Sequence, residues 1–132
     1  MSPTIVVSAV ALVRDGAVLT VRKAGTSRFM LVGGKPEAGE SPLDCALRET
    51  REEVSLDLGA LTLLGEFESE AANEPGHRLH STVYTAELNG EPVAAAEIAE
   101  LRWTALDGDY DDLAPMLRIN VLPLLRERHD LA

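Results

Sequence analysis

Three glutamates near the middle of the chain have the types and the spacing to hold a metal ion. Glu49, Glu52 and Glu53 lie one, three and four positions apart, so on a helix turning about 100° per residue they share one face. Like charges at these spacings repel, and the helix dipole disfavours anions toward the C-terminus. A divalent cation would reverse both effects, and hard cations prefer oxygen ligands. The cluster therefore predicts a Mg²⁺ or Mn²⁺ site. The alternative is a solvated acidic helix face.

The helix that carries these acids is predicted to begin at Ser41. A serine hydroxyl can accept a hydrogen bond from a first-turn N–H, proline is tolerated next, and an early acid suits the positive end of the dipole. Ser41, Pro42 and Asp44 supply these features. The positions expected to face the core fall within one arc of roughly 100°. They are Leu43, Ala46, Leu47, Thr50 and Val54.

Residues 33–56, GGKPEAGESPLDCALRETREEVSL, resemble the Nudix box, whose pattern ends in R-E-aliphatic-x-E-E-x-G-aliphatic. Five residues separate the box glycine from the first glutamate, and seven separate that glutamate from the arginine. Thr50 replaces a larger aliphatic residue. Ser55 replaces the glycine that normally ends the helix, which leaves the shape of the exit turn open. The matching positions are Gly34, Glu40, Arg48, Glu49, Glu52 and Glu53.

This resemblance to the Nudix hydrolases implies both a fold and a reaction. The fold is an α/β/α sandwich with a mixed sheet between helices, and the reaction is metal-dependent hydrolysis of phosphoanhydride bonds. Carried over by position, Glu52 and Glu53 are the principal metal ligands, and Glu49 is a ligand or the general base. The carbonyl of Gly33 is a further ligand in many relatives.

Two other box residues are expected to support the ligands. Glu40 and Arg48 match positions that usually form a salt bridge between the glycine loop and the helix, a structural role behind the metal. For Arg48 alone, the alternative is an ordinary surface cation. Outside the box, relatives often take another ligand or base from a later loop. Glu97, shortly before a strand with Trp103, is the candidate, and Glu100 is its rival. Either could instead be a solvated acid.

Three residues are candidates for contact with the substrate. Arg22 and Lys23 end a strand that leads toward the glycine loop, so they could meet a phosphate, or they could be ordinary strand-end charges. Asn120 precedes the last predicted helix, where some nucleotide-cleaning relatives place an asparagine that reads the base. Helix capping explains Asn120 equally well.

The surrounding pattern predicts one mixed α/β domain over residues 1–132. Asp15-Gly16 predicts a hairpin between two β-rich runs, and the closing helix is expected to begin near Asn120, because Pro123 fits only a first turn. The order of strands and helices favours a sheet covered on both faces. The predicted strands are 5–14, 17–23, 29–32, one or two within 58–70, 78–88 and 101–106.

Composition narrows the classes of function. A net charge of −10 disfavours sequence-independent binding to nucleic acid or anionic membrane. The only cysteine, Cys45, excludes an intramolecular disulfide, which favours a reducing cytoplasm. We find no apolar run of about eighteen residues and expect no signal peptide. His77, His80 and His129 lack the spacing of a zinc site.

The leading functional hypothesis is hydrolysis of a nucleoside diphosphate linked to another group, foremost a nucleoside triphosphate cut to monophosphate and pyrophosphate. Nudix hydrolysis of a nucleotide sugar or other diphosphate ester is the enzymatic alternative. A ligand-sensing domain without catalysis and a purely structural acidic helix are the non-enzymatic ones. The expected partner is a small nucleotide. Whether the chain forms a homodimer is left open; dimerisation is a tendency of the family.

Overall fold

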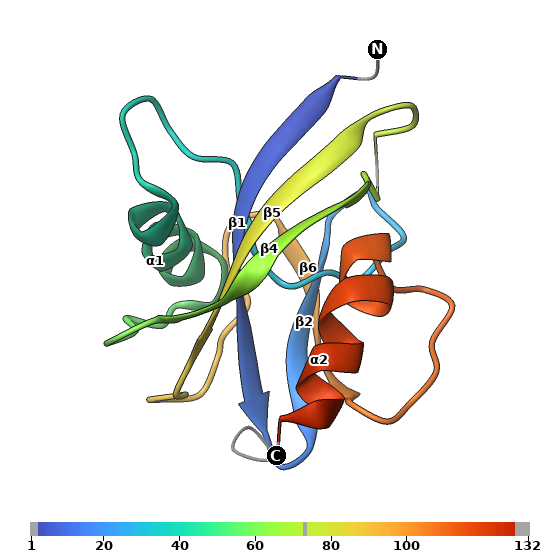
Figure 1. Ribbon diagram of the computed structural model, residues 1–132. Helices are drawn as coiled ribbons and strands as arrows, with labels where there is room; N and C mark the ends of the chain where they lie inside the picture. Colours follow the sequence, from blue (N-terminus) through green and yellow to red (C-terminus); the bar gives the residue numbers. More distant parts are fainter. Residues whose placement is uncertain (1–2, 73, 129–132) are drawn as a thin grey trace.

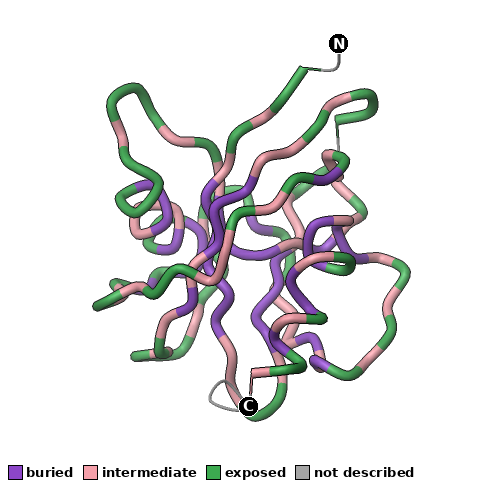
Figure 2. The backbone as a smooth tube through the Cα atoms, in the orientation of Figure 1, coloured by how far each residue is buried: buried purple, intermediate pink, exposed green. Residues whose placement is uncertain are grey.

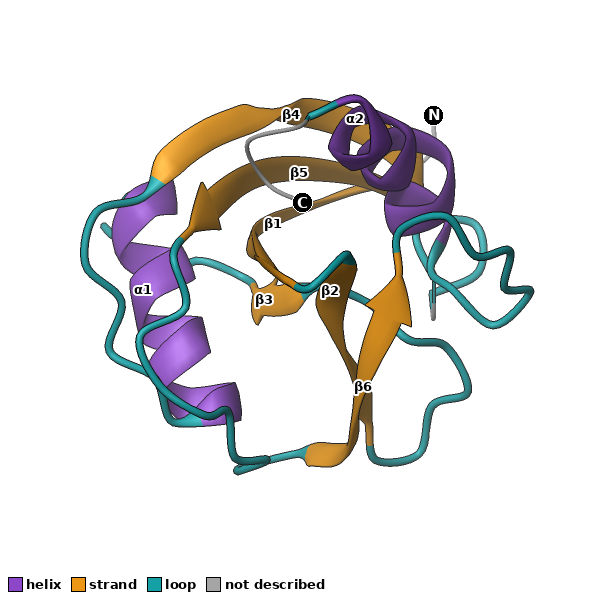
Figure 3. Ribbon diagram, turned by 90° about the horizontal axis from the view of Figure 1, so that it is seen from below, coloured by secondary structure: helices purple, strands orange, loops and turns teal. Residues whose placement is uncertain are grey.

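The computed structural model describes residues 3–72 and 74–128 of the chain. A six-stranded sheet lies between two helical layers (Figure 1). Helix α1 (Pro42–Val54) covers one face, and η1 (Met116–Val121) with α2 (Leu122–Glu127) covers the other. A view turned by 90° shows the two helical layers far apart across the sheet (Figure 3). The predicted α/β/α sandwich with a mixed sheet is confirmed.

The sheet is mixed because one of its pairings is parallel. Its strand order is β4-β5-β1-β2-β6, and β3 pairs separately with β1. Strands β1 and β5 run parallel, and the other pairings are antiparallel. The strands are β1 (Thr4–Arg14), β2 (Ala17–Lys23), β3 (Val32–Gly34), β4 (Thr62–Glu70), β5 (Arg78–Ala86) and β6 (Ile98–Ala105).

The central strand β1 is buried on both faces, as its apolar sequence predicts. Alternate residues enter different cores: Ala9 and Ala11 pack under η1 and α2, whereas Val10 and Leu12 pack on the side of α1. The buried part of the tube in Figure 2 follows this strand through the middle of the molecule. Within the described residues, no helix is long and apolar enough to cross a membrane.

Three strand predictions differ from the structure by three residues or more at the start of the strand. The strand expected at 29–32 begins only at Val32, because Phe29 and Met30 make isolated bridges to other segments. The strand expected within 58–70 starts at Thr62 and passes Gly65 with a bulge instead of a break. Strand β6 starts at Ile98, before the predicted 101.

The prediction for the closing helix is wrong. The helix starts after Pro115 as a π-helix, and Asn120 lies inside it instead of capping it. The N–H of Leu122 donates to the carbonyl of Leu117, five residues back. Proline normally clashes with the carbonyl four residues before it. The wide π turn moves these carbonyls, and Pro123 therefore follows it without ending the helix.

Candidate active site

Helix α1 begins and ends through local contacts that its sequence encodes. The Ser41 hydroxyl accepts a hydrogen bond from the N–H of Asp44 at 3.1 Å. At the other end, Ser55 adopts a left-handed backbone with φ of 62°, and its N–H donates to the carbonyl of Arg51 at 3.1 Å. This conformation costs about 1–2 kcal/mol in a residue other than glycine. Ser55 thus makes the exit turn that glycine usually makes.

The buried face of α1 is rotated from the predicted one. Ala46, Thr50 and Val54 are buried as expected, but Leu43 is 41% exposed, and Cys45 and Glu53 are buried instead. The prediction for Leu43, in the first turn of α1, is therefore wrong. The rotation carries one end of the acidic cluster into the interior.

The three acidic side chains consequently differ in exposure. The side chain of Glu53 is 6% exposed, that of Glu49 15% and that of Glu52 50%. They do not form the single patch open to solvent that helix geometry alone suggested. Burial raises the pKa of Glu53 to about 7, against the lowering effects of the Lys23 ammonium and the Gly33 N–H. Lys23 Nζ lies 3.6 Å from Glu53 Oε2.

Two glycines of strand β3 let this carboxylate wall form. The N–H of Gly33 donates to Glu53 Oε1 at 3.1 Å. A Cβ at Gly33 would collide with the carbonyl of Ser8 and the backbone of Ala9. A Cβ at Gly34 would come within 2.5 Å of the Glu49 carboxyl carbon. Both positions therefore need glycine for close approach, and neither has a positive φ.

Arg48 joins the glycine loop to the acids of α1. Its Nε and Nη2 donate to the two carboxylate oxygens of Glu40 at 2.8 and 2.9 Å, the contact that the box resemblance predicts. Its Nη1 donates to Glu49 Oε1 at 2.8 Å and Glu52 Oε1 at 3.1 Å, and its Nη2 to the carbonyl of Lys35 at 3.1 Å. The guanidinium holds the pKa of Glu40 down to about 2. That this contact braces the loop during catalysis stays a prediction.

A pocket of about 700 Å³ opens against these residues. Glu49, Glu52, Glu53, Lys23 and Glu97 line its charged side. A second group of lining residues, called the apolar side below, comes from β1, β5 and the segment that enters η1. Its residues include Val7, Leu79, Ala114, Pro115 and Met116.

The structure separates the remaining sequence candidates. Glu97 lines the pocket, whereas its rival Glu100 lies 3.1 Å from Arg22 in a cross-strand ion pair. Arg22 is not among the lining residues, although its neighbour Lys23 is. The Oδ1 atom of Asn120 is buried with no hydrogen-bond partner, and Asn120 does not line the pocket. Of these four sequence candidates, Lys23 and Glu97 line the pocket, and Arg22 and Asn120 are not among its lining residues.

The fit of a divalent ion can be judged from these side chains. Among the described residues, no three His, Cys, Asp or Glu side chains are grouped ready to hold a metal ion. Instead, Arg48 contacts Glu49 and Glu52, and Lys23 contacts Glu53. The donors are hard oxygens that suit Mg²⁺, and a buried carboxylate favours a cation beside it. The carboxylates of Glu49, Glu52 and Glu53 fit such an ion if Arg48 and Lys23 release part of their contacts with them.

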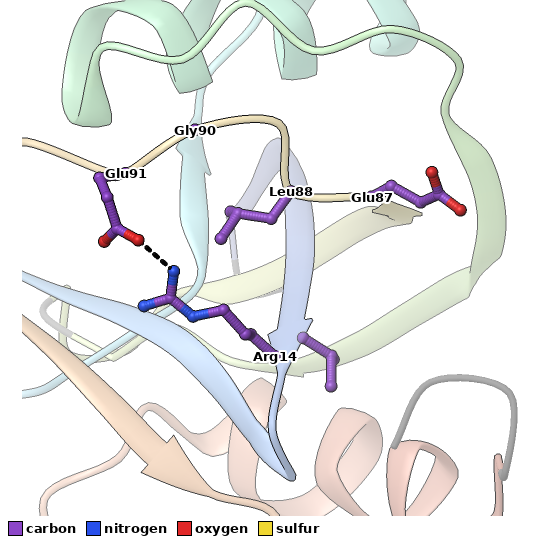
Figure 4. A pocket seen from close by; sticks show the side chains of 6 residues that line it. Arg14, Glu87, Leu88, Gly90 and Glu91 are labelled. Carbon is purple, nitrogen blue, oxygen red and sulfur yellow. Dashed lines mark hydrogen bonds and ion pairs between the residues drawn. The ribbon is translucent and has the colours of Figure 1, made fainter.

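A second hollow, of about 560 Å³, lies at the far end of β1. In Figure 4, Arg14 reaches across it to Glu91, and their ion pair measures 2.6 Å. The Arg14 guanidinium also lies 4.4 Å from the centre of the Trp103 ring. This hollow contains none of the residues that the sequence assigned to a site.

Sequence reasoning did not find the apolar side of the large pocket. Ala114, Pro115 and Met116 follow Asp112, which forms a bidentate ion pair with Arg102 at two distances of 2.8 Å. The members lie on different elements, so no local spacing indicates them. The sequence signal for this segment is Pro115. Proline is excluded from a helix interior but tolerated in a first turn, so it could have marked the start of a helix.

The chain matches the family model described as NUDIX domain over residues 3–119. It is 43% identical over 51 residues to an RNA pyrophosphohydrolase of Halorhodospira halophila, covering 39% of this chain and 28% of that protein. It is 35% identical over 78 residues to the asymmetrical bis(5'-nucleosyl)-tetraphosphatase of Sus scrofa, covering 56% of this chain and 53% of that protein. The matches thus span about half or less of these relatives.

Similarity to a solved structure covers more of the fold. A MutT NUDIX hydrolase from Burkholderia pseudomallei superposes with a TM-score of 0.72 at 29% identity. The match covers 83% of this chain and 89% of that one. The matching box, the sandwich and the family model over most of the sequence lead to one conclusion: the chain belongs to the NUDIX domain family.

Proposed function

We propose that this chain is a divalent-metal-dependent hydrolase that cleaves a phosphoanhydride bond of a nucleoside diphosphate linked to another group. The foremost candidate substrate is a nucleoside triphosphate, with monophosphate and pyrophosphate as products. The observation that carries the proposal is the buried carboxylate of Glu53, which accepts the Gly33 N–H beside Glu49 on one side of a large pocket. A buried acid held beside other acids favours a function that needs concentrated negative charge.

The residues divide the work of the reaction between them. Glu52, Glu53 and Glu49, with the Gly33 carbonyl and Glu97, would hold Mg²⁺ or Mn²⁺. Such an ion neutralises phosphate charge and makes a bound water a better nucleophile. Lys23 can bind a phosphate oxygen once it leaves Glu53, and Arg48 with Glu40 fixes the glycine loop. Glu49 is either a ligand of the ion or the base that accepts the proton of the attacking water. A P–O bond then forms to that water, and the bridging P–O bond breaks.

Two features favour a small nucleotide over a longer nucleic acid. The net charge of −10 opposes binding to a polyanion, and the pocket of about 700 Å³ lies within the usual range for small molecules, roughly 300–1,000 Å³. The names of the two relatives, an RNA pyrophosphohydrolase and an asymmetrical bis(5'-nucleosyl)-tetraphosphatase, support cleavage between phosphates. The buried, single Cys45 accords with a cytoplasmic location.

A hydrolysis screen tests the proposal. Purified protein is incubated with Mg²⁺ or Mn²⁺ and, separately, nucleoside triphosphates, nucleotide sugars and dinucleoside polyphosphates. We expect metal-dependent turnover, fastest with a triphosphate that yields pyrophosphate. Faster turnover of a nucleotide sugar would favour the alternative substrate class. Absence of turnover with every compound would contradict catalysis and favour a ligand-sensing domain.

A further inference from the structure

The loop between β6 and η1, residues 106–115, contributes to the apolar side of the large pocket. Its last two residues, Ala114 and Pro115, line that pocket together with Met116 of η1. Figure 1 shows the loop extending beside α2, away from the sheet. The loop has no regular secondary structure of its own. The position of the pocket wall must therefore be fixed by contacts with other elements.

Arg102 of β6 makes the strongest of these contacts. Its two terminal nitrogens donate to the two carboxylate oxygens of Asp112, each at 2.8 Å. The same guanidinium lies 3.8 Å from the centre of the Phe29 ring and 5.0 Å from that of Tyr110. A bidentate ion pair combined with ring stacking defines both the distance and the orientation of the loop. A lysine could provide the charge but not this geometry.

The ring under Arg102 is connected to the pocket wall through the backbone. The N–H of Phe29 donates to the carbonyl of Asp112, and the N–H of Ala114 donates to the carbonyl of Phe29, both at 2.8 Å. Met30 and Leu31, which follow Phe29, also line the pocket. Arg102 thus holds, through Phe29 and Asp112, both segments that form this part of the wall.

We propose that Arg102 is a positioning residue that sets the apolar wall against which the non-phosphate part of the substrate binds. The inference rests on the proposed function and adds a division of the pocket. Phosphates bind on the side of Glu49, Glu53 and Lys23. The group attached to them packs against Ala114 and Met116, which are apolar members of the pocket lining. Loss of the Arg102 geometry should weaken substrate binding and leave the chemical step intact.

A matched pair of variants tests this role. Arg102→Lys removes the bidentate and stacked geometry and keeps the charge. Arg14→Lys makes the same change in an arginine that is also ion-paired and stacked on a ring, but in the second hollow (Figure 4). Because displacement of binding groups acts on substrate affinity, we expect KM of R102K to rise about fivefold or more with kcat within about twofold. R14K should match the wild type in both constants.

Inorganic tripolyphosphate separates positioning from general damage. It carries phosphates and no attached group, so R102K should leave its inhibition constant unchanged while KM for the nucleotide rises. Asp112→Asn keeps Arg102 and its stacking and should raise KM less, which provides a second variant if R102K folds poorly. The nucleotide used is the one that the wild-type protein hydrolyses fastest in the screen.

The outcomes distinguish the two proposals. Activity in the wild type with an unchanged KM in both R102K and D112N would overturn the role of Arg102 alone. An equal weakening of nucleotide and tripolyphosphate binding, or a fall in kcat without a rise in KM, would also overturn it. Absence of hydrolysis of any compound by the wild type would overturn the proposed function together with this inference.

Discussion

Arg48 and Arg102 each contact residues that belong to, or adjoin, a different part of the lining of the large pocket. Arg48 contacts four carboxylates of its own loop and helix, Glu37, Glu40, Glu49 and Glu52, whereas Arg102 contacts one carboxylate and two rings from other elements. The contacts of Arg48 all lie within thirteen residues of it. Around Arg102, Asp112 and Tyr110 are also near in the sequence, whereas Phe29 comes from a distant segment. The contacts of Arg48 are thus all local in sequence, whereas the apolar side also depends on a segment that only the fold brings to Arg102.

The largest expected effect comes from removing the local arginine. Arg48→Ala leaves Glu49 and Glu52 without this cation and breaks the contact that ties Glu40 of the glycine loop to helix α1. Misplacement of catalytic groups by about 1 Å can lower rates about a hundredfold, so we expect kcat to fall by about that factor. Arg48→Lys should lose less, because it retains the charge but not the fork. Steady-state kinetics measure both. An R48A variant with wild-type kcat would show that the contacts around Arg48 are dispensable.

Gly33 and Gly34 of strand β3 differ in what surrounds them: backbone crowds the first and a side chain crowds the second. Gly33→Ala places a Cβ against the backbone of β1, so it should destabilise the fold by about 1–3 kcal/mol. Gly34→Ala places it against the movable Glu49 carboxylate, so it should reduce activity with a smaller loss of stability. Urea denaturation and kinetics on both variants measure the difference. Equal losses of stability would contradict it.

The next test compares which kinetic constant changes when each of the two arginines is replaced by lysine. R102K should change mainly KM and Arg48→Lys mainly kcat, because Arg48 is the one of these two arginines that contacts predicted metal ligands. The expected rise in KM is about fivefold, smaller than the loss of kcat in R48A. If both lysine variants change the same constant by the same factor, the pocket is not divided as we propose.

The smallest expected effect concerns acid stability. The pKa of Glu40 is lowered to about 2 by Arg48, and the pKa of Asp112 is lowered by Arg102. A lowered carboxyl pKa contributes stability that is complete above the ordinary value near 4.5 and is lost as pH falls through the folded value. Between pH 5 and pH 2.5 the wild type should therefore lose more thermal stability than Glu40→Gln or Asp112→Asn. Parallel pH profiles for all three proteins would contradict these ion pairs.

Features encoded by neighbouring residues could be predicted from the sequence, whereas features that depend on how the elements pack could not. The Ser41 cap, the Asp15-Gly16 hairpin and the sandwich are encoded by neighbouring residues and by order along the chain, and they were predicted. The burial of Glu53 was not, because periodicity shows which residues share a face but not how that face is turned toward the sheet. The start of the last helix was missed because a π turn relieves the constraint that Pro123 places on an α-helix.

The central claim is that buried Glu53 serves catalysis through a divalent ion. Glu53→Gln tests it most directly, because a glutamine oxygen can still accept the Gly33 N–H and a neutral group suits this buried position. Glu87→Gln, an exposed acid in the second hollow, is the control. We expect E53Q to keep its melting temperature within about 4 °C, to lose its thermal response to Mg²⁺ and to lose about a hundredfold or more in kcat. Hydrolysis by E53Q at the wild-type rate in Mg²⁺ would contradict the account.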